Sequence, residues 1–263
     1  MRAFSEFQNG KVKVLFSDID GTLTTNGQLG DRAYDALWNL SRAGFSIVPI
    51  TGRPAGWCEL IARQWPVHGV IGENGAFYFR HTGKKMKRIF LYPRSNRTQN
   101  RERFKKILAR VKTEVPRAKL ASDQFCRMFD LAIDFAEDVQ PPLSKREIVT
   151  IVKLFKEAGA QAKVSDIHVN GWFGDYDKKS ACERYVKDEF GLSVDAMQNR
   201  CVFVGDSPND EPMFQFFKNS FAVGNFREFQ GDVKHQPAYI TETSEGDGFA
   251  EIAEHIIRLK VGQ

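Results

Sequence analysis

Short apolar runs alternate with amphipathic helical patterns along the first part of the chain, and this alternation constrains the fold more than any other feature. Apolar runs at residues 12–16, 45–50 and 67–71 have the length and composition of buried strands. Between them, residues 31–43 and the segment that begins at Pro54 carry apolar residues at helical spacing. Strands and helices in this order predict a parallel sheet with crossover helices.

The alternation stops after Ala76 and returns at Lys178. The segment between them favours a hairpin, a basic helix over residues 99–115, a strand over residues 129–135 and further α+β elements. A helix over residues 145–158 is expected to bury one face, formed by Ile148, Val149, Val152 and Phe155. We therefore predict an α/β fold with a Rossmann-like parallel-sheet core from residues 1–82 and 172–263, and an inserted α+β cap domain from residues 83–171.

The charge and cysteine content narrow the class of protein. A net charge of +5 fits an anionic ligand, whether a phosphorylated metabolite or a nucleic acid, although the basic run at residues 84–110 is also typical of a solvated surface. No window approaches about 18 consecutive apolar residues, so we expect no membrane partner and a cytoplasmic protein. Wide spacing favours free thiols over a disulfide or a zinc site at Cys58, Cys126, Cys182 and Cys201.

Polar clusters stand at predicted strand ends or helix starts, where the loops of a parallel sheet converge on one edge. They contain Asp18 and Asp20, Thr51, Lys178, and Asp206 with Asp210. A carboxylate in such a place can be a nucleophile, an acid or a metal ligand, and a pair allows one to attack while the other handles the proton. Crowded carboxylates repel one another unless a cation lies among them, and hard oxygen ligands favour Mg²⁺.

The hydroxyl of Thr51 and the ammonium of Lys178 are suited to bind the oxygens of an anion, and the lysine also relieves carboxylate repulsion. Each cluster alone has a simpler explanation, because Asp-Gly is a common turn and an aspartate at a helix start is a common cap. Their joint occurrence, in this order and at these places, favours a single site.

These clusters resemble the four motifs of the haloacid dehalogenase superfamily of phosphohydrolases. The motifs stand here as Asp18-Ile19-Asp20-Gly21-Thr22, the threonine of Thr51-Gly52-Arg53, a lysine before a helix, and Gly205-Asp206-Ser207-Pro208-Asn209-Asp210. Two lysines are adjacent at the third motif, and the family frame of a lysine followed by two variable residues and alanine favours Lys178 over Lys179.

The resemblance implies a magnesium-dependent phosphatase. Asp18 would attack phosphorus to form an aspartyl-phosphate, and Asp20 would protonate the leaving oxygen and later activate water. Thr51 and Lys178 would hold the phosphoryl group, and the substrate site would also include Gly52, Arg53 and Asn209. Mg²⁺ would bind Asp18, the backbone carbonyl of Asp20, and Asp206, with Asp210 beside the ion or its ligands.

Glu73-Asn74-Gly75-Ala76 and the insertion between the second and third motifs resemble the Cof-type branch, which includes sucrose-phosphate phosphatases. That branch carries an α+β cap that selects the substrate, which implies a sugar phosphate or a similar small phosphorylated metabolite. In the cap, Arg94, Arg127 and His168 are candidates for substrate contact, and a surface or structural role is the simpler interpretation of each.

Two alternatives stay open. The run Asp177-Lys178-Lys179 also resembles phosphomannomutases, although the compact fourth motif favours a hydrolase. The basic run would also suit a non-catalytic nucleic-acid-binding protein, but it lacks a recognised module and a regular aromatic stacking platform, so no nucleic-acid partner is expected. The sequence leaves the oligomeric state open.

Overall fold

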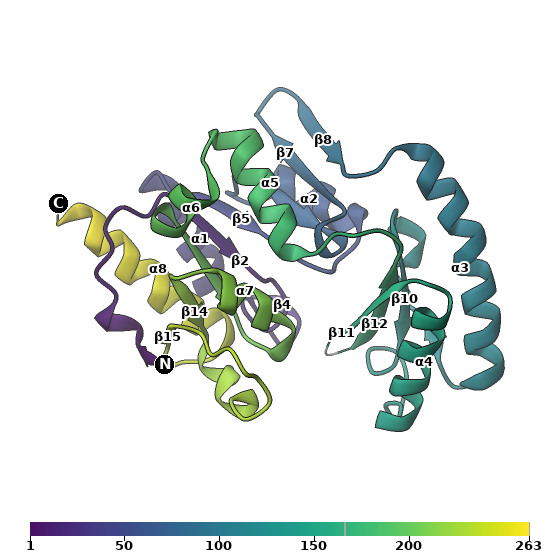
Figure 1. The fold of residues 1–263 in the computed structure, drawn as a ribbon. Coiled ribbons are helices and arrows are strands. Elements are labelled where there is room, and N and C mark those ends of the chain that lie inside the picture. The colour runs from purple at the N-terminus through teal and green to yellow at the C-terminus, as the bar shows by residue number, and fades with distance from the viewer. Residues whose placement is uncertain (166, 263) are drawn as a thin grey trace.

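The computed structural model describes residues 1–165 and 167–262, and its elements form two lobes (Figure 1). The larger lobe contains a parallel sheet with the strand order β1-β15-β14-β13-β2-β5. Its strands are β1 (Arg2–Ala3), β2 (Val14–Ser17), β5 (Ser46–Pro49), β13 (Cys201–Gly205), β14 (Ser220–Ala222) and β15 (Tyr239–Ile240). Both ends of the chain contribute to it, so the predicted α/β fold with a parallel-sheet core is confirmed.

Helices cover both faces of this sheet, because successive strand residues point to opposite sides and both sides are apolar. In β2, Leu15 belongs to one buried cluster, whereas Val14 and Phe16 belong to the other. One face is covered by α1 (Asp31–Arg42), α2 (Ala55–Gln64) and α8 (Glu245–Val261). The other is covered by α5 (Lys178–Phe190), α6 (Val194–Arg200) and α7 (Glu211–Phe216).

The strand predicted at residues 67–71 is shorter than expected and pairs differently. Strand β6 (Val70–Gly72) forms an antiparallel sheet with β7 (Phe77–His81), which pairs in turn with β8 (Met86–Phe90). An isolated parallel bridge between Ile50 and Ile71 joins it to the parallel sheet. The prediction of a third full parallel strand was therefore wrong. The chain reverses at Glu73–Gly75, so β6 forms its backbone hydrogen bonds with β7 instead of with the parallel sheet.

The smaller lobe is an antiparallel sheet with helices on one face (Figure 1). Its strands are β9 (Lys119–Leu120), β10 (Asp130–Asp134), β11 (Gln161–Val164) and β12 (His168–Trp172), and its helices are α3 (Arg94–Glu114) and α4 (Lys145–Glu157). Leu131, Ile133 and Val169 pack in the cluster beneath the helices. The alternating positions, which include Asp130 and Asn170, therefore face away from the helices and toward the larger lobe.

Two local expectations in this lobe differ from the structure. Helix α3 begins at Arg94 rather than at residue 99, because Pro93 occupies its N-cap and starts the helix earlier. In α4, Val149 is 66% exposed, and the buried positions are Ile151, Leu154 and Phe155. The apolar face is thus rotated away from Val149, and the prediction that this residue is buried was wrong.

Further findings concern the cysteines, the helices, a short hairpin and the predicted domain bounds. The described cysteines are all free thiols, as predicted. Among the helices of residues 1–165 and 167–262, none has both the length and the apolar composition needed to cross a bilayer. The hairpin of β3 (Thr24–Thr25) and β4 (Gln28–Leu29) follows the Asp18 loop. The domain bounds at residues 83 and 171 stay a prediction. Strand β8 lies after the first bound but pairs with β7, which lies before it.

Candidate active site

Three aspartates from distant parts of the sequence meet at the carboxyl ends of two neighbouring strands. Asp18 directly follows β2, Asp206 follows β13, and these two strands pair side by side. A carboxylate oxygen from each of Asp18, Asp206 and Asp210 lies within 4.8 Å of the other two, and all three residues are buried. The parallel register explains the meeting, because it places both strand ends at the same edge of the sheet.

The local contacts of Asp206 orient its carboxylate. Thr22 Oγ1 donates to Oδ1 of Asp206 at 2.9 Å, and Asn225 Nδ2 lies 3.4 Å from Oδ2. Gly21 has a φ of +70°, and a Cβ added there would lie 2.5 Å from Oδ2 of Asp206. A glycine is therefore required for the first loop to approach this carboxylate.

The donor set fits a magnesium ion. Three buried carboxylates within reach of one another carry a high local negative charge, and Mg²⁺ prefers anionic oxygen ligands of this kind. Among the described residues, the side chain of Asp20 lies outside this cluster. Its carboxylate is bound instead by Arg53.

Lys178 is buried at the start of α5, where the N-cap side chain of Asp177 accepts from the backbone of Ser180. Its Nζ lies 2.6 Å from Oδ2 of Asp18 and 2.8 Å from Oδ1 of Asp210. Burial disfavours the ammonium, but the charges of these two carboxylates outweigh it and raise the pKa of Lys178. The neighbouring Lys179 is half-buried and lies 3.9 Å from Glu183 on the helix surface.

The carboxyl group of Asp18 is held from two sides. Its Oδ1 accepts from the backbone N–H of Ile19 at 2.8 Å, and its Oδ2 accepts from Lys178. Burial raises the pKa of Asp18 to about 7, and the charge of Lys178 opposes this rise. A further cation at the cluster would therefore stabilise the ionised form of Asp18 and lower its pKa.

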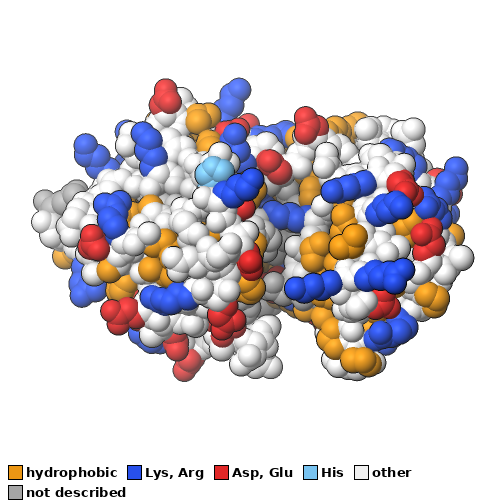
Figure 2. Space-filling model, turned by 60° about the horizontal axis from the view of Figure 1, so that its bottom comes forward, with side chains coloured by type: hydrophobic (Ala, Val, Ile, Leu, Met, Phe, Trp, Pro, Cys, Tyr) orange, Lys and Arg blue, Asp and Glu red, His pale blue; other side chains and the backbone are white. Residues whose placement is uncertain are grey.

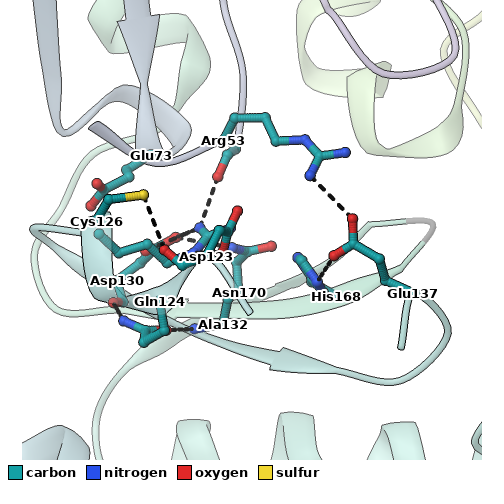
Figure 3. A network of polar contacts seen from close by, with 12 residues as sticks. Arg53, Glu73, Asp123, Gln124, Cys126, Asp130, Ala132, Glu137, His168 and Asn170 are labelled. Atoms are coloured by element: carbon teal, nitrogen blue, oxygen red, sulfur yellow. Dashed lines mark hydrogen bonds and ion pairs between the residues drawn. The ribbon is translucent and has the colours of Figure 1, made fainter. Parts of the chain in front are cut away.

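Arg53 binds Asp20 through two nitrogens. Nε lies 3.0 Å from Oδ2 and 3.1 Å from Oδ1 of Asp20, and Nη2 lies 2.8 Å from Oδ1. The guanidinium stacks 4.6 Å from the centre of the Trp57 ring, which fixes its plane. Its Nη1 lies 3.5 Å from Oε1 of Glu137 in the smaller lobe (Figure 3). Arg53 thus contacts Asp20 in the larger lobe and Glu137 in the smaller lobe.

The loop at Thr51 and Gly52 is also tied to both lobes. Thr51 is fully buried, and its Oγ1 accepts from the backbone N–H of Arg53 at 3.0 Å. The backbone oxygen of Gly52 accepts from Nη1 of Arg127 at 3.0 Å. Asn209 completes this group of predicted residues, because its Oδ1 lies 3.3 Å from Nζ of Lys178.

A cavity of about 400 Å³ lies between the lobes, and Figure 2 shows the molecule hollowed there. A cavity of this size suits a small molecule. The larger lobe contributes Asp18, Asp20, Gly52, Arg53, Lys178 and Asn209 to its lining. The smaller lobe contributes Arg127, Glu137, Lys163, His168 and Asn170.

Arg127 lies in a buried ionic network, and Figure 3 labels its two carboxylate partners, Asp123 and Asp130. Its Nε lies 2.9 Å from Asp123, and its Nη1 lies 3.0 Å from Asp130. Asn170 donates to the same carboxylate of Asp130 at 2.9 Å. These contacts give Arg127 the structural role that the sequence favoured, although the residue also reaches the cavity. Arg94 is exposed, and it lies outside the cavity lining in the part of the chain that the structure describes.

His168 also lies at the cavity, beside Glu137. Nε2 of His168 is 2.9 Å from Oε2 of Glu137, but within the described chain this nitrogen has no partner in hydrogen-bonding geometry. Burial lowers the pKa of His168, and the charge of Arg127 lowers it further. We therefore interpret the contact as one between a neutral imidazole and a carboxylate.

Sequence reasoning missed three residues that shape this site. Glu73 is buried and accepts from the backbone N–H groups of Ala55, Met128 and Phe129, which joins the two lobes. Burial raises its pKa to about 8. The sequence around Glu73 indicates the family resemblance but predicts no role for its side chain. Glu137 and Lys163 stand in the cap without a motif, so no sequence signal identified them.

A family model described as haloacid dehalogenase-like hydrolase matches residues 15–114 and 174–252, which include every aspartate of the cluster. The chain belongs to the haloacid dehalogenase-like hydrolases. As a member of this family it is a phosphatase, and its relatives carry that name. A phosphoglycolate phosphatase of Methanobrevibacter smithii is 24% identical, with 91% of this chain and 96% of that protein covered. One of Nitrosopumilus maritimus is 27% identical, with 94% and 96% covered.

Solved structures of this hydrolase family share the fold. A chain described as a HAD/Cof-like hydrolase from Plasmodium vivax superposes with a TM-score of 0.71 at 17% identity, covering 98% of this chain and 99% of that one. The sucrose-phosphatase of Synechocystis, solved with sucrose and phosphate, gives a TM-score of 0.60 at 17% identity, covering 93% and 97%. These structures confirm the predicted fold, an α/β core with an inserted α+β cap.

Proposed function

We propose that this hydrolase removes phosphate from a small phosphorylated metabolite, a sugar phosphate or a compound of similar size, with Mg²⁺ and through an aspartyl-phosphate on Asp18. The observation that carries the proposal is the contact of Asp18 with Lys178 inside a cluster of three buried aspartates. An ammonium beside a carboxylate nucleophile lets a phosphate dianion approach it, because the lysine offsets the repulsion between them.

In the first step, a carboxylate oxygen of Asp18 attacks phosphorus, and the bond from phosphorus to the ester oxygen breaks. The leaving oxygen takes a proton from Asp20, whose carboxyl group faces the cavity beside Arg53. Arg53 orients Asp20 by its two-nitrogen contact, and Thr51 and Lys178 bind oxygens of the phosphoryl group.

In the second step, a water molecule attacks the same phosphorus. Asp20, now ionised, takes a proton from the water, and the bond between phosphorus and Asp18 breaks to release inorganic phosphate and the free carboxylate. Asp18, Asp206 and the backbone carbonyl of Asp20 would hold Mg²⁺, with Asp210 joining the cluster and binding Lys178. The ion, when bound, would offset the charge of the carboxylates and of the phosphoryl oxygens.

Several observations support a small substrate and a reducing compartment. The cavity of about 400 Å³ would accommodate a short phosphate ester. Two relatives are named for a two-carbon phosphate ester, and one structural neighbour for sucrose phosphate. Free thiols at all four cysteines support a cytoplasmic location.

Phosphate release from a panel of phosphorylated metabolites tests this function. We expect release with Mg²⁺, no release with excess chelator, and no release from D18N with Mg²⁺. A product that is an isomeric phosphate ester instead of free phosphate would assign the chain to the mutases. Undiminished turnover by D18N would overturn the role of Asp18.

A further inference from the structure

Lys163 projects from the polar face of the cap sheet into the cavity. It lies opposite Asn170 in the antiparallel register of β11 and β12, so both side chains stand on the same face. Both residues line the cavity. The face opposite to the packed helices thus forms a polar roof over the catalytic loops, and Lys163 is its ammonium group.

The other cationic groups that the roof and the loops below it present already have anionic neighbours. Arg127 is bound by Asp123 and Asp130, and Arg53 is bound by Asp20. By contrast, within residues 1–165 and 167–262 no carboxylate oxygen lies within the 4.0 Å of an ion pair from Nζ of Lys163. This partly buried ammonium donates to the backbone oxygen of Asn209.

Asn209 places Lys163 relative to the reacting groups. Its side-chain oxygen accepts from Lys178 at 3.3 Å, and its backbone oxygen accepts from Lys163. The two lysines therefore lie on either side of one residue, Lys178 on the floor of the cavity and Lys163 on its roof. In the proposed function the floor binds the phosphoryl group, so the roof faces the part of the substrate that leaves.

We propose that Lys163 binds a substrate carboxylate that is attached to the phosphoester carbon, and thereby selects phosphorylated 2-hydroxy acids over phosphate esters whose leaving group is uncharged. This inference rests on the proposed phosphatase function of the same cavity. With a neutral leaving group the ammonium of Lys163 would have no carboxylate at ion-pair distance among the described residues, in a partly desolvated site, whereas a substrate carboxylate forms a charge-assisted hydrogen bond with it.

Steady-state kinetics with two matched esters test the proposal. One ester is a phosphorylated 2-hydroxy acid, and the other is its carboxamide, which has the same shape without the charge. We expect wild-type protein with Mg²⁺ to favour the acid, and K163M to lower kcat/KM for the acid by about 10- to 100-fold while changing the amide by less than about threefold. K163R should recover part of the loss, and K179M, which changes a lysine outside the cavity lining of the described residues, should behave as wild type.

The outcomes separate this inference from the function on which it rests. Equal losses for the acid and the amide in K163M would mean that Lys163 acts on the phosphoryl group, and would overturn the inference. A wild-type protein that hydrolyses both esters equally well would overturn it too, while leaving the phosphatase function intact. No phosphate release from either ester or from a simple aryl phosphate would overturn the proposed function itself. Thermal unfolding of K163M, expected within about 2 °C of wild type, excludes misfolding as the cause of a loss.

Discussion

Lys178 Nζ lies 2.6 Å from Oδ2 of Asp18, although 160 positions of sequence separate the two residues. Lys178 is the first residue of α5, and Asp18 directly follows β2, so the contact joins a helix start to a strand end. The same ammonium lies 2.8 Å from Asp210, so one buried cation joins the nucleophile candidate to the carboxylate cluster. The charge balance of the whole site therefore depends on Lys178.

Removing the charge of Lys178 should abolish most activity. We expect K178M to lower kcat for phosphate release by about 10³-fold, because two buried carboxylates lose their shared cation and the phosphoryl group loses a ligand. K179M is the matched control, since the neighbouring Lys179 lies on the helix surface beside Glu183 and its removal should change kcat by less than about twofold. Similar losses in the two variants would contradict the assignment of the third motif to Lys178.

A methyl group at Gly21 should disturb the metal site. G21A places a Cβ 2.5 Å from Oδ2 of Asp206, so we expect Mg²⁺ affinity, measured by calorimetry, to fall by about tenfold or more. G83A controls for backbone strain, because Gly83 has a φ of +79° and its added Cβ would meet nothing within 4 Å in the described structure. Both variants should lose about 1–2 kcal/mol of stability from the positive φ. Normal Mg²⁺ binding by G21A would contradict the location of the site.

Magnesium binding should depend on pH through Asp18. Its pKa is raised to about 7 by burial, so a proton occupies this carboxyl below that pH and must leave when the ion binds. The sign follows directly: affinity rises with pH, by about tenfold between about pH 6 and about pH 8. For the metal-free fold the sign is opposite, because a raised acid pKa gives stability at low pH that is lost as the pH rises through 7. Calorimetry in buffers of different ionisation enthalpy would count the released proton, and a pH-independent affinity would refute this account.

Glu73 should stabilise the fold by joining the lobes. E73A leaves the backbone N–H groups of Ala55, Met128 and Phe129 without their acceptor, and we expect the free energy of unfolding to fall by about 2–5 kcal/mol. E73Q keeps one acceptor oxygen and should recover part of the loss. E157A removes an exposed glutamate and should cost less than about 1 kcal/mol in the same urea titration. If E73A unfolds at the same urea concentration as E157A, the three hydrogen bonds contribute little.

The loops of the candidate site could be predicted from sequence because their placement follows from strand direction. Because β2 and β13 are parallel neighbours, the residues that follow them lie at the same edge of the sheet. The aspartates at these strand ends therefore indicate the site directly. The fold class was predictable for the same reason, since the alternation of buried strands and amphipathic helices is local. The pairing of β6 was not, because a strand of this length can join either sheet and only the turn at Glu73–Gly75 decides.

The roof of the cavity could not be predicted, for a physical reason that Lys163 and Glu137 illustrate. Each reaches the larger lobe only because the cap sheet is docked over it, and docking depends on contacts between residues far apart in sequence. The sequence around an isolated lysine or glutamate in an amphipathic strand or loop does not indicate whether the side chain faces solvent or a cavity. The role of Glu73 could not be predicted for the same reason, since its carboxylate accepts hydrogen bonds only because Met128 and Phe129 lie beside it in the folded chain.

The central claim is that phosphorus passes through Asp18, and chemical trapping tests it most directly. Protein mixed with substrate and Mg²⁺ is quenched in acid, reduced with borohydride, which converts an aspartyl-phosphate to homoserine, and digested for mass spectrometry. We predict homoserine at position 18, and its absence from D18N and from protein treated without substrate. Turnover that leaves Asp18 unmodified throughout, or homoserine at another aspartate, would contradict the account.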